Sequence, residues 1–346
     1  MTLLQIDDLK IEYVTTRGIV KAVNGVTLGL NDGENLGLVG ESGCGKTTIA
    51  KSLLRILPLN ARIVGGHIYF QGSDIVTVNE DQMREIRWKK ISTIPQSAMN
   101  ALDPVCRIED QIVELAMKRG NLRRYEVLNR AVDLFQLVGL DKNRLRDYPH
   151  QFSGGMKQRV AIAMALALNP AIIIADEPTT ALDVIVQDEV LKSIYELQKR
   201  LKTSMMLVTH DISIVAEGCD KIAIMYAGKL MEYGETKAVF RSPHNPYTMG
   251  LQNAFPSVKG PKRDLISIPG FPPNLLGLLK GCRFNSRCPF SLPLCAEVDP
   301  PLIEVEPSHF AACHLAEKAE ELGRQAIIKA TWDRIKKRES RMMGAT

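Results

Sequence analysis

The feature that most constrains the fold is a glycine-rich segment at residues 40–47, which reads GESGCGKT. A short apolar run at 36–39 precedes it, and a helical pattern over 47–57 follows it and stops at Pro58. A strand, a glycine loop and a helix in this order predict an α/β fold whose loop turns its backbone N–H groups inward around phosphate. A flexible surface loop is the alternative interpretation, but it leaves the flanking strand and helix unexplained.

Each residue type in this loop suits a phosphate ligand. Gly40, Gly43 and Gly45 carry no side chain, so backbone N–H groups can surround phosphate oxygens, aided by the positive end of the following helix. Lys46 is expected to reach the β and γ phosphates of a nucleotide, and Thr47 to offer its hydroxyl to Mg²⁺. The residues predicted to bind the nucleotide here are Gly40, Glu41, Ser42, Gly43, Cys44, Gly45, Lys46, Thr47 and Thr48.

The remaining pattern predicts an α/β protein with added subdomains. Two strongly apolar segments, 171–176 and 204–210, flank a helix pattern over 184–201, and strands that are apolar throughout suit a parallel sheet covered on both faces. Extended segments within the first thirty residues predict an N-terminal antiparallel β subdomain. Apolar spacing of three and four residues over 108–168 predicts a helical insert.

Two acidic residues end the apolar segment IIIADEP, where open α/β sheets place their ligands. Asp176 is expected to hold the Mg²⁺ shell, and Glu177 to polarise the water that attacks the γ-phosphate. Two acids at a strand end could instead cap the next helix. This pair alone therefore leaves both interpretations open.

A second helix start in the chain also suits phosphate. Ser153, Gly154 and Gly155, in FSGGMKQR at 152–159, open a helix whose first turn has free N–H groups. Two such starts about a hundred residues apart fit one nucleotide poorly, unless the second serves a nucleotide held by another subunit.

With these motifs in this order, the sequence resembles the ATP-binding cassette (ABC) family of transport ATPases over residues 3–234. The matching segments are GESGCGKTT, Gln96 in IPQSAMNALDP, FSGGMKQR, IIIADEP, Asp183 in TTALDV and His210 in LVTHD. One departure is Met156, where many family signatures have glutamine. The resemblance implies a P-loop ABC ATPase core with an N-terminal antiparallel β subdomain, a helical signature subdomain at about 97–165 and a small C-terminal cysteine-containing extension.

The same resemblance gives individual residues expected roles. It implies a head-to-tail dimer in which Ser153 and Gly155 of one subunit close on ATP bound to the phosphate loop of the other. Gln96 would sense Mg²⁺ and the water, His210 would hold the γ-phosphate, and Tyr13 would stack on adenine unless it is an ordinary strand aromatic. Beyond the phosphate loop, the residues expected to bind nucleotide are Tyr13, Gln96, Ser153, Gly154, Gly155, Asp176, Asp183 and His210. Catalysis is expected from Lys46, Gln96, Glu177 and His210, with Mg²⁺ held by Thr47, Gln96 and Asp176.

The segment SPHNPYTMGLQNAFPSV at 242–258 resembles the extension of the dipeptide and oligopeptide importer ATPases, a branch that also serves nickel. Asn245 stands where that extension usually has histidine, with His244 one place earlier. A solvated face is the preferred interpretation of the last, charged stretch, with contact to anionic lipid as the alternative. The predicted parts are a nucleotide-binding domain at 1–240, the extension at 241–316 and a charged C-terminal helix at 317–346.

Four of the seven cysteines lie in the predicted extension, at Cys282, Cys288, Cys295 and Cys313. Structural zinc favours close pairs separated by two to four residues, which this spacing lacks. Four thiolates also suit an iron–sulfur cluster, and the basic side chains of Arg283 and Arg287 would offset its negative charge. Resemblance to the oligopeptide-importer ATPases implies a [4Fe-4S] cluster, while spacing alone leaves zinc and plain buried thiols open.

Composition and charge restrict the partners. A net charge of +5 without a basic domain gives no electrostatic reason to expect nucleic acid, and the longest apolar run, 160–168, is too short to span a bilayer. The N-terminal MTLLQIDDLK is acidic where a signal peptide needs a basic start, so the protein is expected in the cytoplasm. The resemblance implies peripheral attachment to the cytoplasmic face of the cell membrane. The implied partners are a paralogous ABC ATPase, two transmembrane permeases and an extracellular solute-binding protein.

The expected function is ATP hydrolysis that powers an importer of dipeptides or oligopeptides. In this family the ATPase does not touch the cargo, so an oligosaccharide or nickel importer stays open. A soluble ABC ATPase acting on nucleic acid or ribosomes is the alternative from another class. The single cassette without a long coiled-coil insert argues against it.

Overall fold

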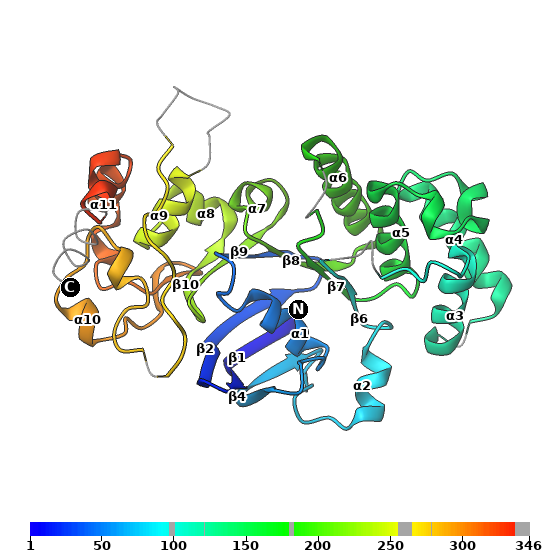
Figure 1. Ribbon diagram of the computed structural model, residues 1–346, viewed down its shortest axis with the longest axis horizontal. Helices are drawn as coiled ribbons and strands as arrows, with labels where there is room; N and C mark the ends of the chain where they lie inside the picture. The colour runs from blue at the N-terminus through cyan, green and yellow to red at the C-terminus, as the bar shows by residue number, and fades with distance from the viewer. Residues whose placement is uncertain (97–100, 121, 180–182, 255–264, 278, 336–346) are drawn as a thin grey trace.

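Two β-sheets enclose helix α1 (Lys46–Leu53), which follows the glycine loop (Figure 1). The computed structural model describes residues 1–96, 101–120, 122–179, 183–254, 265–277 and 279–335. The N-terminal sheet is antiparallel, with strand order β2-β1-β4-β5. Its strands are β1 (Thr2–Thr15), β2 (Gly18–Asn31), β4 (Ala61–Phe70) and β5 (Ser73–Asp74). This sheet confirms the predicted N-terminal antiparallel β subdomain.

The central sheet has the strand order β11-β12-β10-β9-β3-β8-β7-β6. Strands β3, β6, β7, β8 and β9 are mutually parallel, and β10, β11 and β12 continue the sheet antiparallel. Its strands are β3 (Asn35–Val39), β6 (Ile91–Ile94), β7 (Ile172–Asp176), β8 (Ser204–Thr209), β9 (Lys221–Tyr226), β10 (Lys229–Glu235), β11 (Ile303–Glu306) and β12 (His309–Ala311).

The centre of this sheet is buried on both faces. Every residue of β3, β7 and β8 is buried, as their unbroken apolar sequences predict for parallel strands covered by helices on each side. The carboxyl ends of these strands lie together, because Val39 pairs with Thr209 and Asp176 pairs with Val208. The residues that follow the three strands are therefore brought to one edge.

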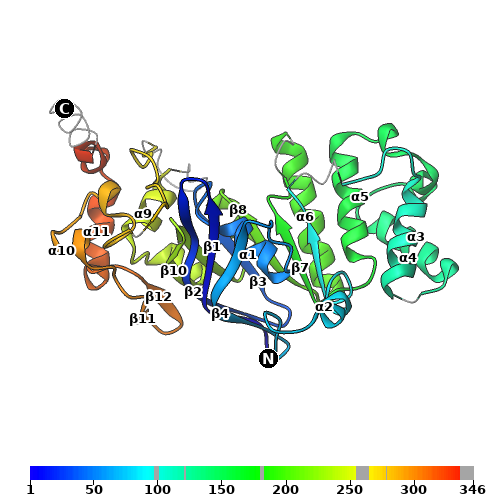
Figure 2. The same cartoon turned by 60° about the horizontal axis from the view of Figure 1, so that its bottom comes forward.

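The helical subdomain and the C-terminal extension lie at opposite ends of the molecule (Figures 1 and 2). The helical subdomain contains α3 (Ile108–Gly120), α4 (Arg124–Leu137), two short 3-10 turns and α5 (Gly154–Leu166). Residues 97–100, at the start of the predicted subdomain, lie outside the described residues. The other helices are α2 (Glu80–Ile86), α6 (Val184–Leu201), α7 (Ile212–Gly218), α8 (Thr236–Arg241), α9 (Pro246–Asn253), α10 (Leu294–Glu297) and α11 (Ala319–Ala326).

The C-terminal extension is joined to the cassette by β-pairing. Strand β12 pairs with β10 through Glu232 opposite Ala311 and Tyr233 opposite Phe310. The β11–β12 hairpin therefore extends the central sheet instead of forming a sheet of its own. Helix α9 packs against α11, so the last described residues also contact the segment that follows the cassette.

Two segments differ from the sequence-based expectation. Helix α1 ends at Leu53 and not near residue 57, because Arg55 adopts a left-handed backbone (φ +50°) that an α-helix cannot continue through. Up to residue 335 the last stretch is not one continuous exposed helix: α11 ends at Ala326, and a second helical segment runs over 329–335. Residues 336–346 of the predicted helix lie outside the described residues. Trp332, within 329–335, is 1% exposed and its indole N–H donates to Ala326 O (2.8 Å), so burial of this ring folds the chain back. No helix among the described residues is both long and apolar enough to cross a membrane.

Candidate active site

The glycine loop connects the end of β3 to α1 in a conformation that needs glycine. Gly40 and Gly45 have φ values of +157° and +107°, at the edge of or within the region that L side chains rarely adopt. A Cβ at Gly40 would lie 2.1 Å from Met225 O, and one at Gly45 would lie 2.3 Å from Ala22 O. Neighbouring backbone therefore closes around the loop, and two of the three predicted glycines are required by space as well as by torsion angle.

Lys46 begins α1 and is almost fully buried, with 5% of its surface exposed. Its Nζ donates hydrogen bonds to Gly40 O (2.6 Å) and Glu41 O (3.0 Å). Carbonyl oxygens orient the ammonium group but do not neutralise its charge. An anion bound at the loop would neutralise the ammonium charge of Lys46, because helix N-termini and buried cations both favour phosphate.

Thr47 and Asp176 meet at the base of the loop. Thr47 Oγ1 donates to Asp176 Oδ1 at 3.1 Å, which joins the start of α1 to the end of β7. Asp176 is 7% exposed, and burial raises the pKa of its carboxyl above the usual value. Hydroxyl and carboxylate oxygens are the donors that Mg²⁺ prefers, so this pair fits the expected metal ligands.

Glu177 lies between the two other polar residues expected at the reaction centre. Gln96 Nε2 donates to Glu177 Oε2 (2.9 Å), and His210 Nδ1 lies 3.3 Å from Glu177 Oε1. The backbone of Glu177 is left-handed (φ +46°) and is fixed by its N–H bond to Val208 O (2.8 Å). A strained non-glycine residue held at a strand end is typical of functional sites.

Tyr13 reaches the same region from β1. Its hydroxyl lies 3.1 Å from Thr48 Oγ1, so the ring stands beside the first turn of α1. Ser42 and Gly43 are exposed at the tip of the loop, while Cys44 is 4% exposed and packs in the core beneath it. Burial raises the pKa of the Cys44 thiol, which favours its neutral form as a packing residue.

The signature residues are not part of this cluster. Ser153 caps α5, with Oγ accepting from Met156 N (3.3 Å), and a Cβ at Gly155 would lie 2.7 Å from Val186 Cγ1. In both views α5 and α1 lie on opposite sides of β7 (Figures 1 and 2). Asp183 caps α6 by accepting from Val186 N (3.0 Å). Helix α5, which residues 153–155 of the SGG turn open, is thus separated from α1 by β7.

The departure at Met156 has a local packing explanation. The side chain of Met156 packs against the helical core, and its sulfur accepts a long contact from Arg144 Nη1 (3.5 Å). Arg144 also donates to Asp147 Oδ2 (2.9 Å) and Gln151 O (2.7 Å), which braces the turns before α5.

Sequence reasoning missed a link from the C-terminal extension to the phosphate loop. Arg287 Nη1 lies 2.8 Å from Glu41 Oε2 and 3.0 Å from Glu41 Oε1, and the Tyr247 hydroxyl accepts from Glu41 N (3.1 Å). The guanidinium also bonds Tyr226 Oη, Pro269 O and Ile268 O. Arg287 was expected to offset the charge of a cluster, but its charge is balanced by Glu41 instead. No local pattern predicts a contact between residues 246 positions apart.

The four C-terminal cysteines lie in one segment and interact. Cys282 N donates to Cys295 O (2.8 Å). Burial, with smaller contributions from neighbouring thiols, raises the pKa of Cys282 to about 12 and that of Cys313 to about 11, and it also raises the pKa of Cys288. All four are free thiols. Within the described part of the chain, no three of their sulfurs lie within 4.8 Å of one another.

Comparison with known proteins identifies the family. Residues 23–180 match the family model described as ABC transporter, and residues 231–295 match the oligopeptide/dipeptide transporter C-terminal region. The oligopeptide transport ATP-binding protein OppD of Escherichia coli is 43% identical over 313 residues, which cover 90% of this chain and 92% of that protein. The chain belongs to the ABC transporter family. The family prediction is thereby confirmed.

Further relatives extend the match to most of this ABC ATPase. The dipeptide transport ATP-binding protein DppD of Lactococcus lactis is 41% identical over 335 residues, 96% of each chain. A solved dimeric ATP-binding cassette in a post-hydrolysis state, bound to ADP and Pi, superposes with a TM-score of 0.60 at 28% identity. It covers 67% of this chain and 98% of its own length. The predicted ABC ATPase fold is confirmed.

Proposed function

We propose that this chain is the ATP-hydrolysing subunit of an ABC importer for dipeptides or oligopeptides. The observation that carries the proposal is the Glu177 carboxylate, bonded to both Gln96 and His210 and one residue beyond Asp176, which meets Thr47 of the phosphate loop. Relatives over 40% identical along nine-tenths of the chain are oligopeptide and dipeptide transport ATP-binding proteins. Their names support peptide as the cargo over oligosaccharide or nickel.

The side chains fit the roles expected of them in phosphoryl transfer to water. Lys46 would hold the β and γ phosphates, and Thr47, Gln96 and Asp176 would hold Mg²⁺, which neutralises developing charge on the phosphate oxygens. Glu177 would accept a proton from the attacking water. At the same time the water oxygen would bond to the γ-phosphorus, and the bond between the γ-phosphorus and the β-γ bridging oxygen would break. His210 would donate a hydrogen bond to the γ-phosphate, and Tyr13 would stack on the adenine.

We further propose that two cassettes form the working unit, with the SGG turn of one facing the phosphate loop of the other. The separation of α5 from α1 within one chain supports this arrangement, because the SGG turn opens α5, on the other side of β7 from the helix that follows the phosphate loop. A related cassette with bound ADP and Pi is described as dimeric. The second cassette is proposed to be a paralogue. A purified chain that forms a stable ATP-dependent homodimer at micromolar concentration would contradict the paralogue.

The remaining partners are proposed from the relatives. Two transmembrane permeases would hold the pair of cassettes at the cytoplasmic face of the membrane, and an extracellular solute-binding protein would deliver the cargo. The described residues include no membrane-spanning helix, so attachment would be peripheral. No nucleic-acid partner is proposed. The proposed division is 1–240 for the nucleotide-binding domain, 241–316 for the extension and 317–346 for the C-terminal segment, and limited proteolysis at these junctions tests it.

A [4Fe-4S] cluster at Cys282, Cys288, Cys295 and Cys313 is proposed for the extension. In a tetrahedral zinc site with Zn–S bonds of ~2.3 Å, the sulfurs are ~3.8 Å apart, whereas no three of these four sulfurs lie within 4.8 Å of one another. Four thiols that are not gathered this closely suit a larger core, and buried Arg283 next to Cys282 supplies positive charge. The cluster would cross-link a segment poor in regular structure. Iron and sulfide analysis of anaerobically purified protein tests it, and stoichiometric zinc without iron would contradict it.

The decisive experiment measures transport by the assembled complex in proteoliposomes. Wild-type complex should hydrolyse ATP and take up labelled dipeptides and pentapeptides, while Glu177→Gln should keep ATP binding and lose both activities. Glu196→Gln, on the exposed face of α6, is the matched control and should behave as wild type. ATP-driven uptake of nickel or a labelled oligosaccharide without peptide would overturn the cargo. Unchanged hydrolysis by Glu177→Gln would overturn the assignment of the site.

A further inference from the structure

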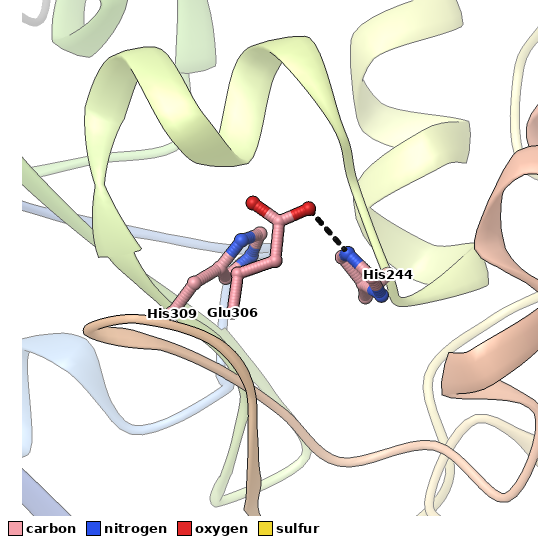
Figure 3. Close-up of side chains that lie close together, drawn as sticks. All are labelled: His244, Glu306 and His309. Atoms are coloured by element: carbon pink, nitrogen blue, oxygen red, sulfur yellow. Dashed lines mark hydrogen bonds and ion pairs between the residues drawn. The ribbon is translucent and has the colours of Figure 1, made fainter.

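A cluster of ligand-bearing side chains lies in the extension, outside the nucleotide site. His244 precedes α9, Glu306 ends β11 and His309 begins β12, and Figure 3 shows the three side chains turned toward one another. One nitrogen or oxygen atom from each lies within 4.8 Å of the corresponding atom of both others. Among the described residues, this is the only group of three or more histidine, cysteine or acidic side chains whose ligand atoms lie this close together.

His309 is held with one ring nitrogen unused. The residue is 0% exposed, and its Nε2 lies 2.8 Å from Glu232 Oε1, whose residue is also 0% exposed. Glu232 accepts backbone hydrogen bonds from His244 N (2.7 Å) and Asn245 N (3.1 Å) as well, so it is the acceptor and His309 Nε2–H the donor. Nδ1 of His309 then carries a lone pair, and it is buried without a hydrogen-bond partner. Such an atom is costly unless something binds it.

His244 has the same arrangement with the roles of its two ring nitrogens exchanged. Its Nδ1 lies 2.9 Å from Ala316 O, a carbonyl that can only accept, so Nδ1 carries the proton. Nε2 is then a lone-pair donor, 3.4 Å from Glu306 Oε1 and 3.3 Å from Ser242 Oγ. Metal-binding histidines have their other ring N–H bonded to a carboxylate or a backbone carbonyl, which fixes ring orientation and tautomer. Both histidines here meet that description.

Glu306 supplies the charge and the open side of the cluster. Its side chain is 36% exposed, while those of His244 and His309 are 12% and 0% exposed. Two neutral imidazoles and one carboxylate therefore converge, with solvent on the Glu306 side.

We propose that His244, Glu306 and His309 bind a divalent transition-metal ion of the zinc class, with water in the fourth position. Metal–ligand bonds of ~2.0–2.1 Å in a tetrahedral site put ligand atoms ~3.3 Å apart. The 3.4 Å between His244 Nε2 and Glu306 Oε1 matches that spacing, and rotation of the partly exposed Glu306 can bring its carboxylate closer to His309. Imidazole nitrogens select zinc-like ions over Mg²⁺ and Ca²⁺.

The bound ion would join the β11–β12 hairpin to the segment between α8 and α9. His309 and Glu306 come from the hairpin, while His244 comes from the segment between α8 and α9, and Glu232 behind them lies in β10. The site shares no ligand with the four cysteines. A plain histidine–glutamate ion pair without metal is the competing interpretation, and the binding experiment separates the two.

The test uses the purified full-length chain, stripped with a chelator, and titrated with Zn²⁺ against a chromophoric competitor and with Co²⁺ by optical spectroscopy. Glu306→Gln and His244→Gln remove a ligand, and Glu304→Gln, an exposed acid on the same hairpin outside the cluster, is the matched control. The cysteines are untouched in every variant, so their contribution is common to all. Glu306→Gln changes a partly exposed side chain, so its fold should survive.

Wild type and Glu304→Gln should bind one more equivalent of Zn²⁺ than either ligand variant. The loss of Zn²⁺ affinity in the ligand variants should exceed the 10–100-fold loss that follows removal of a residue that only hydrogen-bonds to a ligand. The additional Co²⁺ should show d–d bands without added thiolate charge-transfer absorption. Zn²⁺ should also raise the melting temperature of wild type and Glu304→Gln above that of Glu306→Gln. Equal stoichiometry, affinity and thermal shift in all four proteins would overturn the proposal and leave an ion pair.

Discussion

Arg287, next to Cys288 in the extension, forms a buried ion pair with Glu41 in the phosphate loop. The arginine side chain is 4% exposed and Nη1 lies 2.8 Å from Glu41 Oε2. Tyr226 adds a hydroxyl at 3.1 Å and a ring face with its centroid 5.6 Å from the guanidinium carbon. The loop that should hold ATP is therefore fixed from outside the cassette, by a residue between two of the four cysteines.

Arg287→Met should weaken ATP binding and lower stability, because it leaves the partly buried Glu41 carboxylate without its partner. In a double-mutant cycle with Glu41→Gln, measured by urea unfolding, we expect a coupling of about 0.5–3 kcal/mol. Glu41 is 26% exposed, which places the value toward the lower end. Binding of a fluorescent ATP analogue by the same variants gives the nucleotide readout.

The matched control for this cycle is the pair of Arg324 and Glu320 on α11. Their side chains are 73% and 88% exposed, so solvent screens the interaction. Removing either should leave ATP binding unchanged and give weaker coupling than the Arg287 cycle. Equal coupling in the two cycles would show that the link to the phosphate loop is not energetically significant.

His210→Ala should slow ATP hydrolysis in the assembled transporter by about 10²–10³-fold, as loss of one positioned hydrogen-bond donor does. The imidazole lies 3.3 Å from Glu177 and is 62% exposed, so its removal leaves no cavity and should not change stability. ATP binding should persist, because the loop and Lys46 are untouched. His67→Ala, a half-exposed histidine paired with Asp74 on the N-terminal sheet, is the control and should hydrolyse ATP as wild type does.

Much of the fold follows from local sequence, and the exceptions have clear physical reasons. Unbroken apolar runs mark β3, β7 and β8, and the predicted helix at 184–201 coincides with α6. These patterns depend only on neighbours within one turn or one strand. The end of α1 and the turn before Trp332 were missed because a left-handed residue and a buried ring decide them.

The nucleotide site divides in the same way. Motif spacing predicts the residues of the phosphate loop and of the strand end. The family resemblance predicts Gln96 and His210, and both contact Glu177 in the structure. The Arg287–Glu41 pair and the His244–Glu306–His309 cluster depend on the extension folding against the cassette. Hydrophobic periodicity in a single sequence does not predict contacts between residues so far apart along the chain, so only the three-dimensional structure reveals them.

Gly45→Ala should destabilise the protein, because a Cβ there would lie 2.3 Å from Ala22 O at a backbone φ of +107°. Strain of this kind costs about 1–3 kcal/mol before any steric clash is added. Thermal unfolding measures the effect. Gly323→Ala in α11 is the matched control: its backbone is helical and its Cβ meets nothing within 4 Å. That substitution should stabilise by roughly 0.5–1 kcal/mol, and similar losses at both positions would contradict the steric argument.

Replacement of a proposed cluster ligand should lower ATP affinity by displacing Arg287. Cys288→Ser should remove bound iron and also weaken ATP binding several-fold, because Arg287, the residue before it, would lose its fixed position beside Glu41. Cys106→Ser, at a partly exposed thiol far along the chain, should change neither iron content nor ATP affinity. In the Arg287→Met background, Cys288→Ser should still remove iron but cause no further loss of ATP affinity. Additive losses in that double variant would show that the cysteine segment acts on the loop by another route.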